Sequence, residues 1–266
     1  MGLHDEIVRQ LEGPATAGFH RIAWDLRYAQ SGPWTANPQD NYIVFSGALA
    51  APGEYTVSLA TRKNGVLTDT GLESGIKVKL MRQNKLATAS ADEVVAFGTR
   101  LDDLMRQANG AEAAIKSALS ELKAIKDTLP RSGANSELKE RARSLELQLL
   151  NLQLQLSGDP VRDLAGDPGP VSVARRINVV QLGTSFSSYG PTPTHTRSLE
   201  IAEQGFSGIK QDLDRVFKTE LPALRDAMDE AGVPWTPGRG VPASRSEEHT
   251  SELQSPCNLV CRLLLE

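Results

Sequence analysis

The chain contains very little cysteine. Its two cysteines, Cys257 and Cys261, both lie in residues 245–266. Residues 1–244 have none, which excludes disulfide bonds and thiolate metal sites from that part of the chain. The histidines of the same part, His4, His20 and His195, do not share a ligand-like spacing. We therefore expect no metal site.

Neither sign of charge dominates. The sequence has 29 Lys and Arg against 33 Asp and Glu. Two of the basic and four of the acidic residues lie in residues 245–266, so residues 1–244 have 27 against 29 and a net charge of −2. This balance gives no electrostatic footprint for nucleic acid. The sequence also lacks a run of about 18 apolar residues, so we expect no membrane span.

Catalytic motifs are missing as well. The sequence has no G-x-S-x-G elbow and no glycine loop of the kind that cradles phosphate. The acidic residues of the helical part alternate with Lys and Arg, as on solvated faces, and do not suggest a carboxylate pair across a cleft. We therefore name no catalytic residue and no cofactor.

Residues 245–266 read RSEEHTSELQSPCNLVCRLLLE. They resemble the translation of a common sequencing adapter, with Pro256 to Asn258 at the place of its variable barcode. We expect this tail to be an artefact that does not pack on the rest of the chain. Both cysteines then carry no structural meaning.

Residues 5–82 show strand and turn patterns. Apolar and polar residues alternate in Ile22–Leu26, Tyr55–Leu59 and Ile76–Leu80, and Asn64-Gly65 is typical of a two-residue hairpin turn. With segments near Ile7 and Val66, about five short strands are expected. That is too few for a complete seven-stranded sandwich.

From Ser90 onward the apolar period is that of helices. Ser90 and Glu93 fit a capping box, and two heptad series follow up to Pro130. Further stripes predict a second helix from about Ser136, a third near Pro170 and a fourth that continues past Pro222 with its stripe shifted by one residue. The heptad series are Val94, Leu101, Ala108, Ile115, Leu122 and Leu129, and Phe97, Leu104, Ala111, Ala118 and Ile125.

Four residues stand out as possible contact residues. Trp34 and Tyr42 lie in a long polar loop, where a large aromatic side chain has no obvious core to fill. Arg175 and Arg176 are adjacent cations that could receive a phosphate or a carboxylate. The alternative is that Trp34 covers the edge of the sandwich and that both arginines are ordinary surface residues.

Two stretches resemble a known family. The segments GFHRIAWDLR (18–27) and PGEYTV (52–57) resemble the Ig-like or fibronectin-like module near the end of large bacterial proteins with BNR/YVTN-type β-propellers. These propellers are related to that of sortilin, and the proteins are often labelled glycosyl hydrolase. The helical part is also similar to theirs, through PTPT (191–194), LPAL (221–224) and AGVPWTPGR (231–239).

The resemblance implies a parent protein larger than this chain. No propeller repeat is present, so the resemblance carries over no catalytic residue, and it places Met1 inside a longer protein. It implies an upstream propeller domain as the first partner, with a protein or a glycan as a further one. The parent is expected to be secreted or periplasmic.

Together these patterns predict an α+β chain. An incomplete antiparallel β-sandwich of the Ig/FnIII type occupies residues 1–86, an antiparallel four-helix bundle residues 87–240, and a disordered artefactual tail residues 241–266. The expected function is that of a non-catalytic scaffold or interaction region, a fragment of a β-propeller protein. Two alternatives stay open: an accessory piece of a carbohydrate-processing enzyme, with Trp24, Trp34 and Trp235 near a glycan, and a coiled-coil adaptor that binds a partner helix along Ala108–Ala118.

Overall fold

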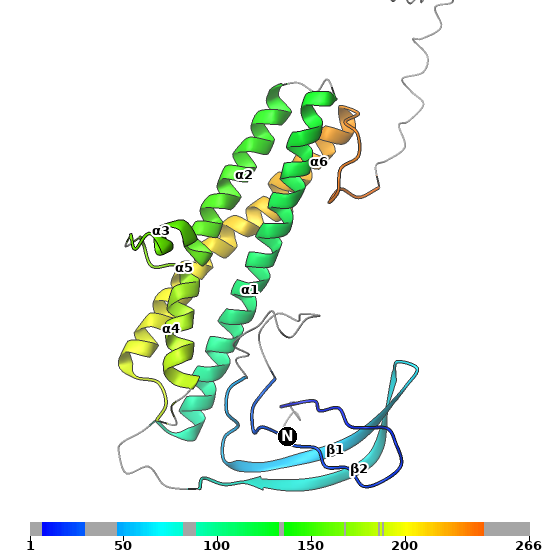
Figure 1. Cartoon of the computed structure of the whole chain (residues 1–266), viewed down its shortest axis with the longest axis vertical. Helices are drawn as coiled ribbons and strands as arrows, with labels where there is room; N and C mark the ends of the chain where they lie inside the picture. Colours follow the sequence, from blue (N-terminus) through cyan, green and yellow to red (C-terminus); the bar gives the residue numbers. More distant parts are fainter. Residues whose placement is uncertain are drawn as a thin grey trace, which may run out of the picture.

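A computed structural model describes residues 7–29, 47–81, 89–132, 136–167, 169–185, 187 and 189–241. Within them a long helical part stands on a two-stranded β-ribbon (Figure 1). Trp34, Tyr42 and the adapter-like tail with its two cysteines lie outside the described residues.

The ribbon is the hairpin that the Asn-Gly pair predicts. Strand β1 (Gly53–Lys63) pairs antiparallel with β2 (Val66–Val78), and Lys63 lies opposite Val66. Asn64 and Gly65 have φ angles of 51° and 81°. Two consecutive positive φ angles are those of a type I′ turn, whose twist matches that of the strands.

The expected β-sandwich is wrong. The described residues contain one sheet of two strands, and outside it only an isolated bridge between Arg27 and Leu49. The alternating segment Ile22–Leu26 forms no strand: Leu26 has a φ of 57°, outside the extended region, and the indole N–H of Trp24 donates to the carbonyl of Arg27. Alternation shows which side chains share a face, but a strand also needs a neighbour for its backbone groups.

The first two helices run antiparallel. Helix α1 (Ala91–Thr128) begins at the predicted capping box, in which Ser90 and Glu93 satisfy each other's backbone N–H groups. A short 3₁₀ turn, η2 (Leu129–Arg131), contains Pro130 and ends it. Helix α2 (Ser136–Ser157) then returns along α1 and stops before Gly158, whose φ is 89°.

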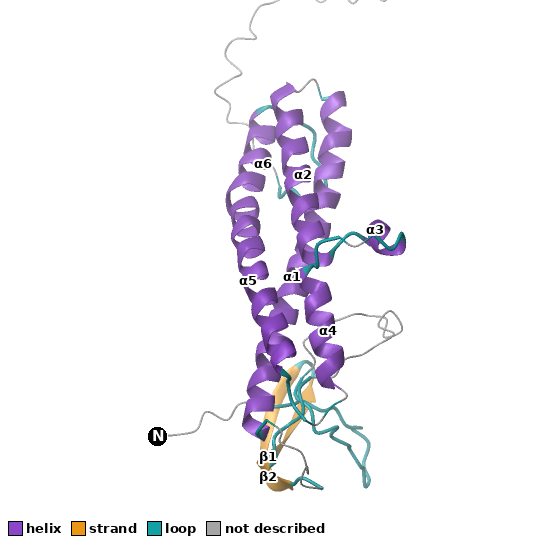
Figure 2. Cartoon of the chain, turned by 90° about the vertical axis from the view of Figure 1, so that its left-hand side faces the viewer, coloured by secondary structure: helices purple, strands orange, loops and turns teal. Residues whose placement is uncertain are grey.

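The later elements build two further lengths of helix. They are α3 (Pro160–Leu164), α4 (Val173–Ser185), α5 (Pro193–Arg215), the π-helix η3 (Val216–Glu220) and α6 (Leu221–Glu230). Helices α5, η3 and α6 follow one another without a break. Helix α4 continues downward below α2, with the short α3 beside the junction (Figures 1 and 2).

The expected antiparallel four-helix bundle is therefore also wrong. Helices α2 and α4 share one column, which packs against the column of α1 and against that of α5 and α6, and these two columns also touch each other (Figure 1). The sequence pattern gives helix lengths and stripes, but it does not say that two short helices lie end to end. One consequence is that Leu147, Leu150 and Leu154 of α2, which would face a further neighbour, are exposed.

The heptad stripe of α1 forms the centre of the core. All its predicted members are buried except Val94 and Ala111, which are half-buried. The other columns contribute their own stripes. Fully buried or nearly so are Ile115, Leu122, Ile125, Leu129, Leu149, Leu156, Val180, Leu199, Val216, Leu224 and Met228.

The shift of the apolar stripe at Pro222 has a specific cause. The backbone N–H of Leu221 bonds to the carbonyl of Val216, five residues earlier. This π-turn inserts one residue into the helix, so Leu221, Leu224 and Met228 again face the core. It also spares Pro222, which has no N–H to donate, from the interior of a regular helix.

The β-ribbon is joined to the helical part at the start of α1. The backbone N–H of Ala48 donates to the carboxylate of Asp102 at 3.3 Å. Ala48 also packs on Gly98, where a Cβ atom would come within 2.6 Å of the Cβ of Ala48. A small residue at position 98 therefore lets the segment before β1 approach α1.

Candidate functional site

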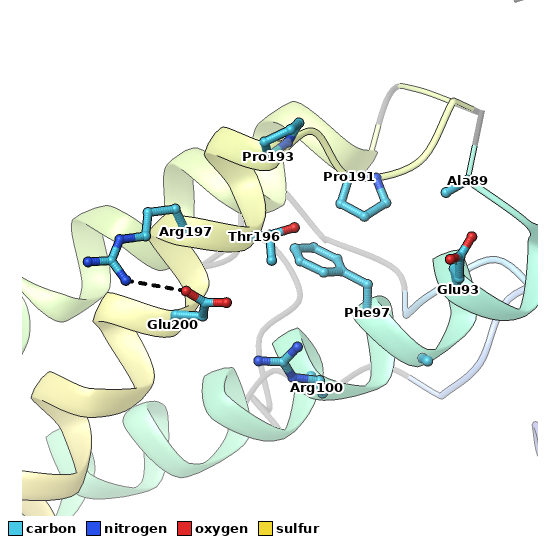
Figure 3. A pocket seen from close by; sticks show the side chains of 10 residues that line it. Ala89, Glu93, Phe97, Arg100, Pro191, Pro193, Thr196, Arg197 and Glu200 are labelled. Atoms are coloured by element: carbon cyan, nitrogen blue, oxygen red, sulfur yellow. Dashed lines mark hydrogen bonds and ion pairs between the residues drawn. The ribbon is translucent and has the colours of Figure 1, made fainter. Parts of the chain in front are cut away.

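An open groove lies between the beginnings of α1 and α5. Its volume is about 700 Å³, and Phe97 lies in it between Thr196 and Arg100 (Figure 3). We call it the α1–α5 groove. It is lined by Ala89, Glu93, Ala96, Phe97, Arg100, Pro191, Pro193, Thr196, Arg197 and Glu200.

The charged groups of the α1–α5 groove already have partners. Glu93 accepts hydrogen bonds from the backbone N–H of Ser90 at 2.7 Å and from its hydroxyl at 2.9 Å. Those bonds lower the pKa of Glu93, which is the wrong direction for a general acid at neutral pH. Glu200 pairs with Arg197 (Figure 3).

Arg100 links α1 to α5. Its Nε and Nη2 donate to the two carboxylate oxygens of Glu203 at 3.3 and 2.8 Å. The hydrogen bonds with Glu203 raise the pKa of Arg100 above its ordinary value. The groove is thus built from capping and tethering contacts, and its geometry does not assemble a nucleophile with a base.

Arg175 and Arg176 do not form a common anion site. The guanidinium of Arg175 donates to the carboxylate of Asp163 at 3.2 Å and so ties α4 to α3. Its side chain is exposed, whereas Arg176 is half-buried. Trp34 and Tyr42, the other two predicted contact residues, lie outside the described residues.

The two described tryptophans are at opposite ends of the molecule. Trp24 belongs to the segment beside the hairpin, where its ring meets Tyr55 edge-on with centroids 5.2 Å apart. Trp235 belongs to the segment after α6 and is 57% exposed. They cannot line one glycan site, because the helical columns separate the two segments (Figure 1).

A group of polar contacts that the sequence does not reveal closes the far end of the columns. Arg225 of α6 forms a bidentate ion pair with Glu121 of α1, and Gly238 lies directly against the Glu121 carboxylate. Arg239 pairs with Asp229 and donates to the carbonyls of Val233 and Pro234. We call residues 233–241 the C-terminal cap.

The hairpin has an exposed apolar face. The register places Tyr55 opposite Ile76 and Leu59 opposite Leu72, with Val57 between them on the same face. We call these five residues the hairpin apolar face. Val57, Leu59, Leu72 and Ile76 are 42% to 63% exposed, and the opposite face carries Glu54, Ser58, Glu73 and Lys77. The alternation predicts this face, but it also predicts a second sheet to cover it.

The described part of the chain offers no group of three or more His, Cys, Asp or Glu side chains that could hold a metal ion. None of its helices is both long enough and apolar enough to cross a bilayer.

Comparison with known proteins adds no relative. No family model, no curated protein and no solved structure matches the chain.

Proposed function

We propose that this chain is a non-catalytic scaffold and interaction region of a larger β-propeller protein. The observation that carries the proposal is the hairpin apolar face, on which four large apolar side chains are exposed. Covering such side chains gains about 25 cal/mol per Å², so an open face of this kind marks a contact surface.

The helical columns suit a supporting role. Their core runs from Phe97 near the hairpin to Leu129 at the other end of α1. The Arg100–Glu203 and Glu121–Arg225 pairs fasten the column of α1 to that of α5 and α6 at two heights. The hairpin is attached at Gly98 and Asp102, near the beginning of α1. In this view the helices form a stiff arm that presents the hairpin to another domain.

The coiled-coil adaptor is the weaker alternative. It needs the small residues of α1 as a free seam for a partner helix, but Ala108 and Ala118 are buried inside the chain's own core. Gly110, beside them, faces open space on the other side of an unbroken helix. A partner helix would have to displace α2 or α5 to reach the seam.

The carbohydrate-processing alternative rests on aromatic residues near a glycan. Trp24 and Trp235 lie at opposite ends, and the carboxylates of the α1–α5 groove cap or tether helices. Saturable binding or hydrolysis of a polysaccharide by the full chain would favour this alternative over the scaffold.

The scaffold proposal is tested in two steps. First, the DNA upstream of the Met1 codon should encode propeller repeats in the same reading frame. Second, the protein extended by that region is compared with the present chain by amide hydrogen exchange of residues 53–78. We expect at least about tenfold slower exchange in the extended protein, because its upstream domain covers the hairpin apolar face. An upstream sequence without repeats, or unchanged exchange, would contradict the proposal.

A further inference from the structure

The two edges of the hairpin are not equivalent. The register of the ladder shifts between Leu59 and Ala60, which leaves Thr70 and Gly71 of β2 unpaired as a bulge. Gly71 has a φ of 68° and its N–H bonds to the Asp69 side chain. The bulge interrupts the outer edge of β2, whereas β1 runs through eleven residues without an extra one.

The outer edge of β1 is accessible along its middle. The segment 7–29 touches β1 near its two ends, through Trp24 on Tyr55 and through Glu12 on Arg62. Every residue from Thr56 to Lys63 is exposed. Among the described residues, no backbone hydrogen bond reaches β1 from any segment other than β2. A continuous edge with free N–H and C=O groups is a template for another strand.

The charges of β1 are complementary under a two-fold rotation. Antiparallel pairing of β1 with itself about Ser58 sets Glu54 of one chain opposite Arg62 of the other, twice. It sets Val57 opposite Leu59 and Thr56 opposite Ala60. No like charges meet, and opposite residues share a face, so the Val57 and Leu59 side chains of one chain lie beside Leu59 and Val57 of the other, and Tyr55 lies opposite Thr61.

We propose that the partner of the β1 edge is a second copy of this chain, joined by antiparallel β1–β1′ pairing about Ser58. The result is a four-stranded sheet, β2–β1–β1′–β2′, of closed two-fold symmetry. The inference rests on the proposed interaction function and names one of its partners. The β1–β1′ pairing leaves the hairpin apolar face uncovered and doubles its width, so a second layer can still pack on this face.

Two features of the single chain favour this pairing. A two-stranded ribbon is marginally stable in water, and two added strands give it a sheet of ordinary size. Glu54 and Arg62 already make ion pairs with Lys77 and Glu12, at 3.1 and 2.9 Å, but all four side chains are well exposed. Such surface ion pairs hold a side chain weakly, so Glu54 and Arg62 can each also reach the second copy of the chain.

Cross-linking at the two-fold axis tests the register. In full-length protein with Cys257→Ser and Cys261→Ser, Ser58→Cys should form a disulfide-linked dimer under mild oxidation, because residue 58 lies opposite its own copy. Thr56→Cys is the matched control on the same strand and face. Its copies would be four residues apart along the strand, roughly 13 Å, which is too far for a disulfide.

Charge reversal tests the pairing without cysteine. Light scattering over a concentration series, from about micromolar to about millimolar, gives the dimer dissociation constant. Glu54→Lys should raise it about tenfold, since two attractive pairs become repulsive. Adding Arg62→Glu should restore it, and Glu73→Lys on β2 should leave it unchanged.

A chain that stays monomeric throughout, or that cross-links equally at positions 56 and 58, contradicts the β1–β1′ dimer. So does a dimer that Glu54→Lys does not weaken. Whether the upstream DNA encodes propeller repeats does not depend on any of these results, so failure of the dimer and failure of the scaffold function are distinguishable.

Discussion

Arg225 of α6 donates two hydrogen bonds, each 2.7 Å long, to the two carboxylate oxygens of Glu121 in α1. Glu121 is 7% exposed, and 104 residues separate the pair in the sequence. Arg225→Ala would leave a carboxylate in a nearly closed site. Because Arg225 itself is one-third exposed, we expect a loss of about 2 kcal/mol in the free energy of unfolding, less than for a fully buried pair. Urea denaturation measures it.

The control for this pair is Arg106→Ala. Arg106 pairs with Asp103 on the exposed face of α1, so its loss should cost less than about 0.5 kcal/mol. Equal effects of the two substitutions would show that the buried pair has no special weight.

Some of this structure is predictable from the sequence because it depends on local pattern. The hairpin turn needs only Asn64 and Gly65, and the beginning of α1 needs only Ser90 and Glu93. The burial of Glu121 is different. In the sequence Glu121 lies next to Leu122 and resembles a surface residue. It is buried because Arg225 and Gly238, more than 100 positions away, lie against it.

The arrangement of the columns is also non-local. The stripes of α2 and α4 are visible in the sequence, but the sequence does not show that the two helices lie end to end in one column. The stripe shift at Leu221 is visible in the sequence too, but its cause, a π-turn, is not. Of the predicted contact residues, Arg175 was found in an ion pair that no local pattern predicts.

The C-terminal cap depends on a glycine. Gly238 has a φ of 94°, and a Cβ atom there would lie 2.7 Å from the carboxylate carbon of Glu121. Gly238→Ala should therefore displace the cap, lower the free energy of unfolding by about 2 kcal/mol and change the fluorescence of Trp235. Gly240→Ala is the control, because a Cβ atom at Gly240 meets open space. Unchanged fluorescence in Gly238→Ala would show that the cap does not rest on Glu121.

The core stripe should be sensitive at its centre. Leu122 is fully buried, so Leu122→Ala leaves a cavity and should cost about 3 kcal/mol. Leu154→Ala removes the same atoms from a leucine of α2 that is 47% exposed, and should cost less than about 1 kcal/mol. Similar losses of stability for both variants in thermal unfolding would contradict the burial of Leu122 in the core.

The capping box predicts a pH dependence. Hydrogen bonds from the backbone and the side chain of Ser90 lower the pKa of Glu93 below its ordinary value. A lowered carboxyl pKa contributes stability above the ordinary pKa, and this is lost as the pH falls through the lowered one. The difference in unfolding free energy between the native chain and Glu93→Gln should therefore be present at neutral pH and vanish in acid. Glu140→Gln, on the exposed side of α2, should show no such trend, and a difference that persisted in acid would exclude the carboxylate as its source.

Binding of an apolar fluorescent dye tests the central claim, that the hairpin carries an uncovered contact surface, most directly. Val57→Ser combined with Leu72→Ser removes the side chain at the middle of the hairpin apolar face and the most exposed one, which are 48% and 63% exposed. The account predicts that the folded chain binds the dye, and that the double variant loses most of this signal while its helical part unfolds at an unchanged temperature. Dye binding that is the same in both proteins, or a double variant whose helices are destabilised, would contradict it.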